Sequence, residues 1–200
     1  LIPENAIVVD ESVTTGRETM GVTAGAAPHD MIQNMGGSIG YSPPVATGAA
    51  VACPDRKVIC LTGDGSAMYT IQSLWTQARE NLDVTTIVFA NHSYAILKGE
   101  YANMGAGVPG ARALTMIDID RPRIDWLAMA RSMGVPGVAV ESAQALHQVK
   151  AQFTSCTPST SCAAQGRNCG SIWNGCATET CGPYGGGCAA NQQCNGSGQC

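Results

Sequence analysis

An aspartate between two glycines, followed by an asparagine 27 positions later, makes up the pattern in this chain best suited to metal chemistry. Asp64 follows the apolar run "KVICLTG", and Asn91 closes the apolar run "VTTIVFAN". Both runs predict buried strands, since they are continuous, apolar and rich in β-branched residues. Ligands bind beyond the carboxyl ends of parallel strands, so the two side chains are expected to converge there. Carboxylate and amide oxygens suit Mg²⁺ better than Zn²⁺.

The segment after Asp64 predicts a partner for that metal. Apolar residues recur at three and four positions through residues 66–81, which favours a helix with Ser66 as its N-cap. The start of a helix binds phosphate, and Mg²⁺ commonly completes its shell with phosphate and water. Gly63 and Gly65 allow the backbone to approach closely. These residues predict a Mg²⁺–diphosphate site, whereas Gly-Asp-Gly by itself is more often only a turn.

Strands and helices are expected to alternate along the first three quarters of the chain. Strands are predicted at residues 6–9, 57–63, 84–91 and 137–140, and helices at 44–52, 66–81, 125–133 and 142–153, with a short helix after Tyr94. This alternation is typical of an α/β fold with a doubly wound, mainly parallel sheet. Residues 11–20 are predicted to be a polar loop, and a glycine-rich turn is expected before residue 44.

Composition excludes several classes of protein. Hydrophobic residues make up 44% and charged residues 13%, which allows a packed core. The net charge of -4 provides no basic surface for nucleic acid. No uncharged run reads as a membrane span, and the opening "LIPENAIVVDE" lacks the pattern of a signal peptide. We therefore predict no nucleic acid or membrane partner, and a chain cut from a longer protein.

The last quarter of the chain predicts a second, very different domain. Eight of the ten cysteines lie in residues 154–200, which have many turn residues and no periodicity. A module this small needs covalent cross-links to be stable, so we expect four disulfides in a loop-dominated fold. Zinc is the alternative, although neither CxxC pairs nor Cys/His mixtures occur. The predicted domains are residues 1–153 and 154–200.

The metal pattern and its neighbours resemble a known family. Gly63-Asp64-Gly65 with Asn91 is similar to the thiamine diphosphate motif of the acetolactate synthase and pyruvate decarboxylase superfamily. The stretches "DES", "GGSIG" and "GDGSAMYTIQ…NHSYAIL" occur in the order found in acetolactate synthase/benzoylformate decarboxylase-like members. The resemblance covers residues 1–153. It implies the diphosphate-binding half of a thiamine diphosphate-dependent lyase or transferase that acts on 2-oxo acids.

The resemblance also implies roles for individual residues. The Mg²⁺ ligands would be Asp64, Asn91 and the backbone carbonyl of Ser93. The residues implied to bind thiamine diphosphate are Thr14, Gly37, Ser38, Ile39, Gly63, Gly65, Ser66, Ala67 and Tyr94.

The turn "GGSIG" would contact the aminopyrimidine ring of the cofactor. Gly37 would offer its carbonyl to the 4′-amino group, and Ile39 would be an apolar wedge that keeps the cofactor folded. Without the resemblance, Ile39 is better explained as ordinary core. Glu11 is expected to order the turn, with a loop carboxylate near the cofactor as the alternative, and Leu97 is expected to line a substrate pocket. His92 is expected to point away from the metal.

The resemblance implies that the site is completed elsewhere. In this family a pyrimidine-binding domain supplies the glutamate that activates the cofactor, and the active site lies between two subunits. The chain is therefore expected to be a homo- or hetero-oligomer without turnover of its own. It is either a fragment or a stand-alone subunit that pairs with a pyrimidine-binding subunit.

An alternative function starts from the cysteine-rich end. Residues 156–200 resemble short modules of secreted bacterial proteins, some likened to carbohydrate-binding segments. Trp173 and Tyr184 could stack on a sugar or form the module's own core. In this reading the α/β part is a non-catalytic scaffold. The predicted compartments conflict, since the α/β domain is expected in the cytoplasm and disulfides in an oxidising compartment. A natural fusion, a gene-assembly artefact and a chimera all remain open.

Overall fold

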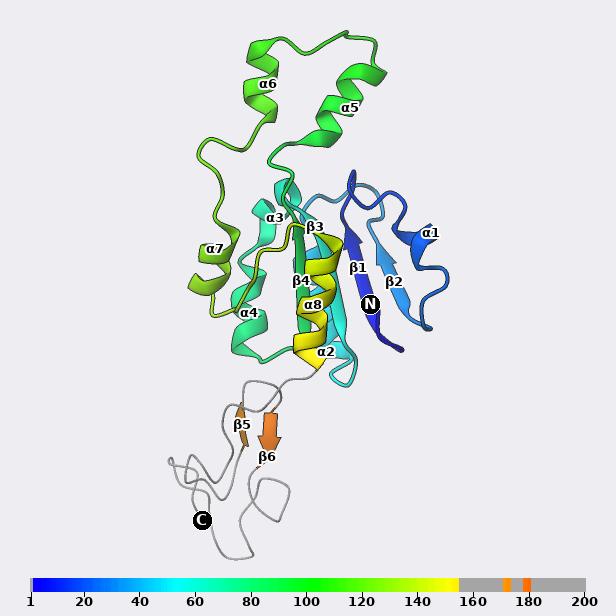
Figure 1. The fold of residues 1–200 in the computed structure, drawn as a ribbon, viewed down its shortest axis with the longest axis vertical. Helices are drawn as coiled ribbons and strands as arrows, with labels where there is room; N and C mark the ends of the chain where they lie inside the picture. Colours follow the sequence, from blue (N-terminus) through cyan, green and yellow to red (C-terminus); the bar gives the residue numbers. More distant parts are fainter. Residues whose placement is uncertain (1, 155–170, 174–177, 181–200) are drawn as a thin grey trace, which may run out of the picture. The chain divides into compact units, whose positions relative to one another are not determined.

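A parallel four-stranded sheet organises the first part of the chain (Figure 1). The computed structural model describes residues 2–154, 171–173 and 178–180. Its contacts divide the chain into two units, Leu1–Ala139 and Val140–Cys200. The sheet of the first unit contains β1 (Ile7–Glu11), β2 (Asp30–Gln33), β3 (Val58–Gly63) and β4 (Val84–Phe89), in the order β2-β1-β3-β4. The predicted α/β class with a parallel sheet is confirmed.

The strand order reverses direction between β1 and β3. From β1 the chain passes to β2 on one side, and later to β3 and β4 on the other. Glu11 is paired with Thr62, and Gly63 with Phe89, so these three strands end nearly level with one another. The carboxyl edge at such a reversal is where open α/β sheets bind ligands.

Seven helices are described in the first unit. They are α1 (Thr19–Thr23), α2 (Ser42–Ala52), α3 (Asp64–Thr70), α4 (Ser73–Arg79), α5 (Ala95–Asn103), α6 (Ala111–Ile117) and α7 (Trp126–Ser132). Helices α5 and α6 project past the carboxyl edge of the sheet (Figure 1). The second unit contains α8 (Ala143–Thr154) and the antiparallel pair β5 (Ser171–Trp173) and β6 (Thr178–Thr180). No helix within the described residues is long and apolar enough to cross a membrane.

Two apolar clusters hold the first unit together. In one, Ala46 and Ala50 of α2 pack against Val9, Val58 and Cys60 of the sheet. The small alanine side chains let the helix axis lie close to the strands. In the other, α3 and α4 pack against α7 and β4 through a set of buried and half-buried residues: Ala67, Ile71, Leu74, Val88, Trp126, Met129, Ala130, Met133 and Val135. The second cluster fixes the helix that begins at Asp64.

Several predicted elements need correction. The helix predicted at residues 66–81 is two helices, separated at Ile71–Gln72, where i→i+3 bonds from Leu74 and Trp75 tighten the chain. Such a turn keeps the spacing of apolar residues at three and four positions, so this spacing cannot distinguish two helices from one. Residues 137–140 were predicted to be a strand, but they pair with no described strand, and the side chain of Val138 is 54% exposed.

Other elements were not predicted at all. Strand β2 is short and lies at the edge of the sheet with mostly exposed side chains, so it lacks a continuous apolar run. Helices α1 and α6 were also missed, because each is short and neither has a strong apolar face. The helices predicted at residues 44–52, 125–133 and 142–153 correspond to α2, α7 and α8. Asp125 and Ser142 accept backbone N–H bonds at the starts of α7 and α8.

The predictions made for the cysteine-rich end lie outside the described residues. All eight of its cysteines, and Tyr184, fall in the ranges that the structure does not describe. The disulfides, the zinc alternative and the domain boundary at residue 154 therefore stay predictions. Within the described residues, Cys53 and Cys60 are free thiols.

Cys60 predicts a loss of stability at high pH. Burial raises the pKa of this fully buried thiol from 9.0 to about 12. The contribution of the neutral Cys60 thiol to the stability of the fold is complete below pH 9. It declines as the pH rises toward 12, because this thiol ionises at lower pH in the unfolded chain than in the folded one. The free energy of unfolding should fall by up to about 1.4 kcal/mol per pH unit through this group. Urea unfolding at pH 8, 9 and 10 should show a shallower decline in Cys60→Ala; equal slopes would contradict the assignment.

Candidate functional site

The carboxylate of Asp64 links the ends of β3 and β4. Asp64 is the first residue of α3, directly after β3, and its side chain is only 2% exposed. Its Oδ1 accepts the N–H of Gly65 at 2.9 Å, and its Oδ2 accepts the N–H of His92 at 2.6 Å. Each oxygen keeps a further lone pair beyond these bonds. The carboxylate is thus held in place and still able to bind a cation.

The loop after β4 is bonded to this carboxylate through His92, and it also carries Asn91 and Ser93. Asn91 Oδ1 accepts the N–H of Ser93 at 3.0 Å, which fixes the amide at the turn. His92 adopts a left-handed backbone conformation, with φ of 57°, and this reverses the chain between the two residues. Its ring accepts a hydrogen bond from Arg123 Nε at 3.1 Å. The structure thus brings Asp64 together with the segment 91–93, while the His92 side chain has a different partner.

The start of α3 differs from its predicted form. Ser66 is not the N-cap: Gly63 occupies that position, and Asp64 already lies in the first helical turn. A larger residue at position 65 would displace the Tyr94 side chain, because an added Cβ would lie 2.7 Å from the ring of Tyr94. The first helical turn leaves backbone N–H groups without intrahelical acceptors, and this turn includes Ser66. Ala67 packs its methyl group into the core.

The turn before α2 is shaped by glycines with positive φ. Gly36, Gly37 and Gly40 have φ of 76°, 71° and 82°. Asn34 clamps the turn, since its side chain accepts the N–H of Ser38 at 2.9 Å and donates to the Ser38 carbonyl at 3.1 Å. Ile39 is 59% exposed. Ile39 is therefore not ordinary core, and its side chain is available to a ligand.

The end of this turn is anchored to both β1 and α3. Glu11, buried in β1, accepts the N–H of Gly40 at 2.5 Å and the N–H of Ser42 at 2.9 Å. Thr70 Oγ1 donates to the Gly40 carbonyl at 2.6 Å. Glu11 orders the turn as the sequence predicted, and α3 contacts the turn at one end and carries Asp64 at the other.

Thr14 lies in the loop that follows β1, at the same edge of the sheet. At the start of this loop, Ser12 donates both its N–H and its hydroxyl to Oδ1 of Asp10 in β1, at 2.9 Å and 2.5 Å. No hydrogen bond among the described residues joins the Thr14 side chain to Asp64 or to the glycine turn. Thr14 therefore lies at the same edge of the sheet as the other candidate cofactor-binding residues, but no hydrogen bond among the described residues holds its side chain to them.

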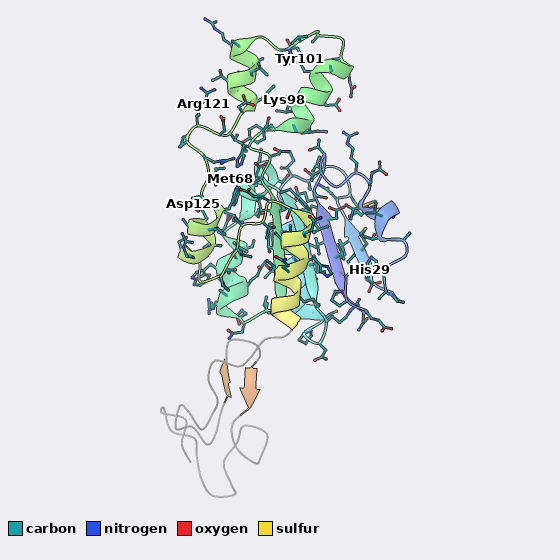
Figure 2. All side chains as sticks on the ribbon, viewed as in Figure 1. His29, Met68, Lys98, Tyr101, Arg121 and Asp125 are labelled. Carbon is teal, nitrogen blue, oxygen red and sulfur yellow. The ribbon has the colours of Figure 1, made fainter. Side chains whose placement is uncertain are left out.

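Sequence reasoning missed a pair of residues that hold the 91–94 loop. Asp118 Oδ1 accepts from Lys98 Nζ at 2.8 Å and from Ser93 Oγ at 3.4 Å, and the hydrogen bond from Lys98 leads the effects that lower the pKa of Asp118. Ser93 and Asp118 also form an antiparallel β-bridge. Figure 2 labels Lys98 on α5, beside the segment after α6 that carries Arg121. No motif in the sequence marked this contact, which joins positions 25 residues apart.

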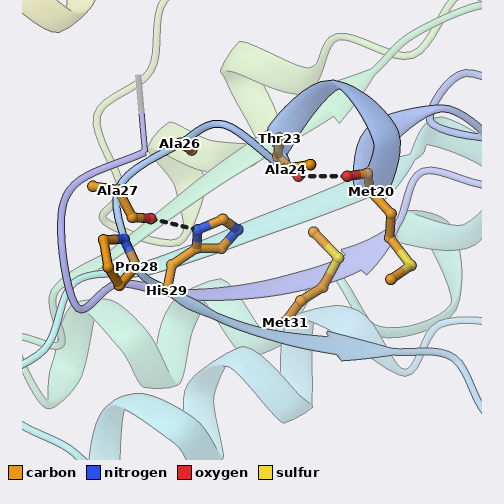
Figure 3. Close-up of a pocket in the computed structure, with 8 residues that line it drawn as sticks. All are labelled: Met20, Thr23, Ala24, Ala26, Ala27, Pro28, His29 and Met31. Carbon is orange, nitrogen blue, oxygen red and sulfur yellow. Dashed lines mark hydrogen bonds between the residues drawn. The ribbon is translucent and has the colours of Figure 1, made fainter.

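A separate hollow lies away from these residues. It is lined by residues of α1, β2 and the segment between them: Met20, Thr23, Ala24, Ala26, Ala27, Pro28, His29 and Met31 (Figure 3). The His29 ring is hydrogen-bonded to the Ala27 carbonyl at 2.8 Å. The hollow shares no residue with the candidate site, and we assign it no ligand.

The candidate oxygens at the strand ends are hard ligands. No group of three or more His, Cys, Asp or Glu gathers anywhere in the described part of the chain. The candidate set has one carboxylate, the amide oxygen of Asn91 and the carbonyl of Ser93. Such a hard, sparsely charged set suits Mg²⁺ that takes its remaining ligands from phosphate and water.

Comparison with known proteins identifies the family of this chain. Residues 15–161 match the family model "Thiamine pyrophosphate enzyme, C-terminal TPP binding domain". A Mycobacterium tuberculosis protein named "Putative acetolactate synthase large subunit IlvX" is 54% identical over 145 residues, which cover 72% of this chain and 28% of that protein. The acetolactate synthase large subunit of Parasynechococcus marenigrum is 33% identical over 133 residues, covering 66% of this chain and 21% of the relative.

A solved structure shares the fold. The thiamine diphosphate-dependent 4-hydroxybenzoylformate decarboxylase of Rhodococcus jostii RHA1 superposes with a TM-score of 0.64 at 30% identity, covering 78% of this chain and 28% of that one. The chain thus spans roughly a quarter of the length of these relatives. It belongs to the thiamine pyrophosphate enzyme family and contains that family's C-terminal cofactor-binding domain.

Proposed function

We propose that the α/β domain binds thiamine diphosphate and Mg²⁺, as the diphosphate-binding half of an enzyme that acts on 2-oxo acids. The observation that carries this proposal is the buried Asp64 carboxylate, hydrogen-bonded to the N–H of His92 so that the ends of β3 and β4 share one site. The names of the relatives, an acetolactate synthase and a decarboxylase among them, support the substrate class.

Asp64 Oδ, Asn91 Oδ1 and the Ser93 carbonyl would hold Mg²⁺ against the diphosphate. The backbone at the start of α3 would surround the phosphate oxygens, with Thr14 and Tyr94 at the margin of the site. On the pyrimidine side, the carbonyl of Gly37 would accept from the 4′-amino group, with Ser38 and Ile39 beside the ring. When bound, the cofactor would supply the electron sink for cleaving or forming the bond next to the keto carbon.

The complete active site would require a second protein part. A pyrimidine-binding domain or subunit would supply the activating glutamate, in a homo- or hetero-oligomer that works in the cytoplasm. The 200-residue chain alone should then bind the cofactor without turning over a 2-oxo acid. Both lyase and carboligase outcomes are compatible with the residues described.

Two measurements on the purified chain test this function. Calorimetric titration with thiamine diphosphate should show binding at one site per chain in the presence of Mg²⁺ and little binding in the presence of a chelator. An assay of 2-oxo acid decarboxylation should show no turnover by the same sample. Absence of cofactor binding would refute the proposed site, and turnover by the chain alone would refute the need for a second part.

For residues 154–200 we propose a module stapled by four disulfides. The support is the even number of cysteines in a segment too small to stabilise itself by apolar burial alone. A thiol count on the metal-free chain, denatured without a reductant, should find two free thiols, Cys53 and Cys60. Ten free thiols would refute the disulfides.

Asp118 should affect the metal side of the proposed site. In Asp118→Asn, the ion pair with Lys98 is lost and the 91–94 loop is held less firmly, although the partly exposed pair contributes little to overall stability. We expect the dissociation constants of thiamine diphosphate and of inorganic diphosphate, both with Mg²⁺, to rise together by about three- to tenfold. Asp120→Asn, which changes the exposed neighbouring pair with Arg121, serves as the control. Unchanged affinities in Asp118→Asn would contradict the role.

A further inference from the structure

Glu11 is a buried carboxylate to which the proposed cofactor contacts give no role. It is the last residue of β1 and only 2% exposed. Both of its oxygens are used, one by the N–H of Gly40 at 2.5 Å and the other by the N–H of Ser42 at 2.9 Å. A buried carboxylate is costly unless it is hydrogen-bonded. Its two bonds go to the same short segment, where the glycine turn enters α2.

The turn is held at Ser38 and at Gly40, and Ile39 lies between these two residues. Both backbone polar groups of Gly40 are hydrogen-bonded: Glu11 accepts from its N–H, and Thr70 Oγ1 donates to its carbonyl at 2.6 Å. At the other end, Asn34 makes two hydrogen bonds with the backbone of Ser38. Strand β1 lies between β2 and β3, so Glu11 stands on an interior strand of the sheet. The position of Gly37 and of the exposed Ile39 therefore follows from these anchors.

We infer that Glu11 is a positioning residue that sets the glycine turn against the aminopyrimidine half of the cofactor. The inference rests on the proposed function. Glu11 acts through Gly40, and no hydrogen bond among the described residues joins it to the proposed metal ligands or to the start of α3. Asp64, by contrast, is bonded to the loop that serves the diphosphate half. Loss of Glu11 should thus weaken binding only of ligands that carry the pyrimidine.

The variant Glu11→Gln separates the two halves of the cofactor. Glutamine has the same shape, but its amide nitrogen faces an N–H donor, so either Gly40 or Ser42 loses its acceptor. With Mg²⁺ present, we expect the dissociation constant of thiamine diphosphate to rise about tenfold and that of inorganic diphosphate to stay unchanged. Glu18→Gln, at an exposed carboxylate of the same loop region, should change neither.

Thr70→Val is the second variant, in case Glu11→Gln does not fold. It removes the other hydrogen bond to Gly40 with little change in size, and it should give the same pattern with a smaller effect. Thermal unfolding and near-ultraviolet circular dichroism establish that each variant is folded. Equal weakening of both ligands, or of neither, in the folded variants would overturn the inference. Failure of the wild-type chain to bind either ligand would instead refute the proposed function, and the inference with it.

Discussion

Replacing Asp64 by alanine should abolish cofactor binding at concentrations that saturate the wild-type chain. Asp64 is the only carboxylate in the proposed ligand set, and it is buried between Gly65 and His92. Loss of an outer partner of a metal ligand costs about 10–100-fold in affinity, so loss of this direct ligand should exceed about a hundredfold. Calorimetric titration with thiamine diphosphate and Mg²⁺ measures the effect.

The same substitution should also destabilise the fold. It leaves the N–H groups of Gly65 and His92 without their acceptors, at a cost of about 1–3 kcal/mol. Asp64→Asn keeps one acceptor oxygen and should recover part of the stability while binding the cofactor poorly. Asp55→Ala, at an exposed position between α2 and β3, should change neither property. Cofactor affinity in Asp64→Ala equal to that of the wild type would count against the whole site.

Gly40→Ala should be the most destabilising substitution in the glycine turn. Gly40 has φ of 82°, and an added Cβ would lie 2.5 Å from the Cβ of Tyr69. That atom is attached directly to the backbone of α3, so it cannot rotate out of the way. Backbone strain and the clash together should lower the free energy of unfolding by about 2–4 kcal/mol. Urea denaturation provides the measurement.

Gly48→Ala is the matched control, and it should change the free energy of unfolding in the opposite direction. Gly48 is an exposed residue inside α2, and an added Cβ would meet no atom within 4 Å. Alanine in a helix interior is favoured over glycine by about 0.5–1 kcal/mol, so this variant should be slightly more stable. If both variants shifted the midpoint by the same small amount, the anchoring of the turn on α3 would be wrong.

The nearness of Asp64 to the loop after β4 could be predicted because it depends on local rules. Two apolar strands joined by a helical segment pair as parallel neighbours, and residues just beyond their ends meet. That argument needs only the spacing of Asp64 and Asn91. It did not foresee how the two are joined, since the bond from His92 N–H to Asp64 Oδ2 depends on a left-handed residue in the loop.

Contacts made across the fold could not be predicted in the same way. Asp118 reaches Ser93 through a single β-bridge, which leaves no periodic pattern in the sequence. The exposure of Ile39 follows from glycines with positive φ on either side, and an isoleucine between glycines is equally compatible with a core position. The prediction of a strand at residues 137–140 was wrong, because a short apolar run does not determine whether a partner strand lies beside it.

Diffraction from crystals of the chain grown with thiamine diphosphate and Mn²⁺ in place of Mg²⁺ tests the central claim most directly. The anomalous signal of Mn²⁺ locates the metal independently of the refined coordinates. We predict one peak at about 2.1 Å from oxygens of Asp64, Asn91 and the Ser93 carbonyl, with the diphosphate completing the shell. A metal–diphosphate peak elsewhere on the chain, or ordered cofactor without metal at Asp64, would contradict the account.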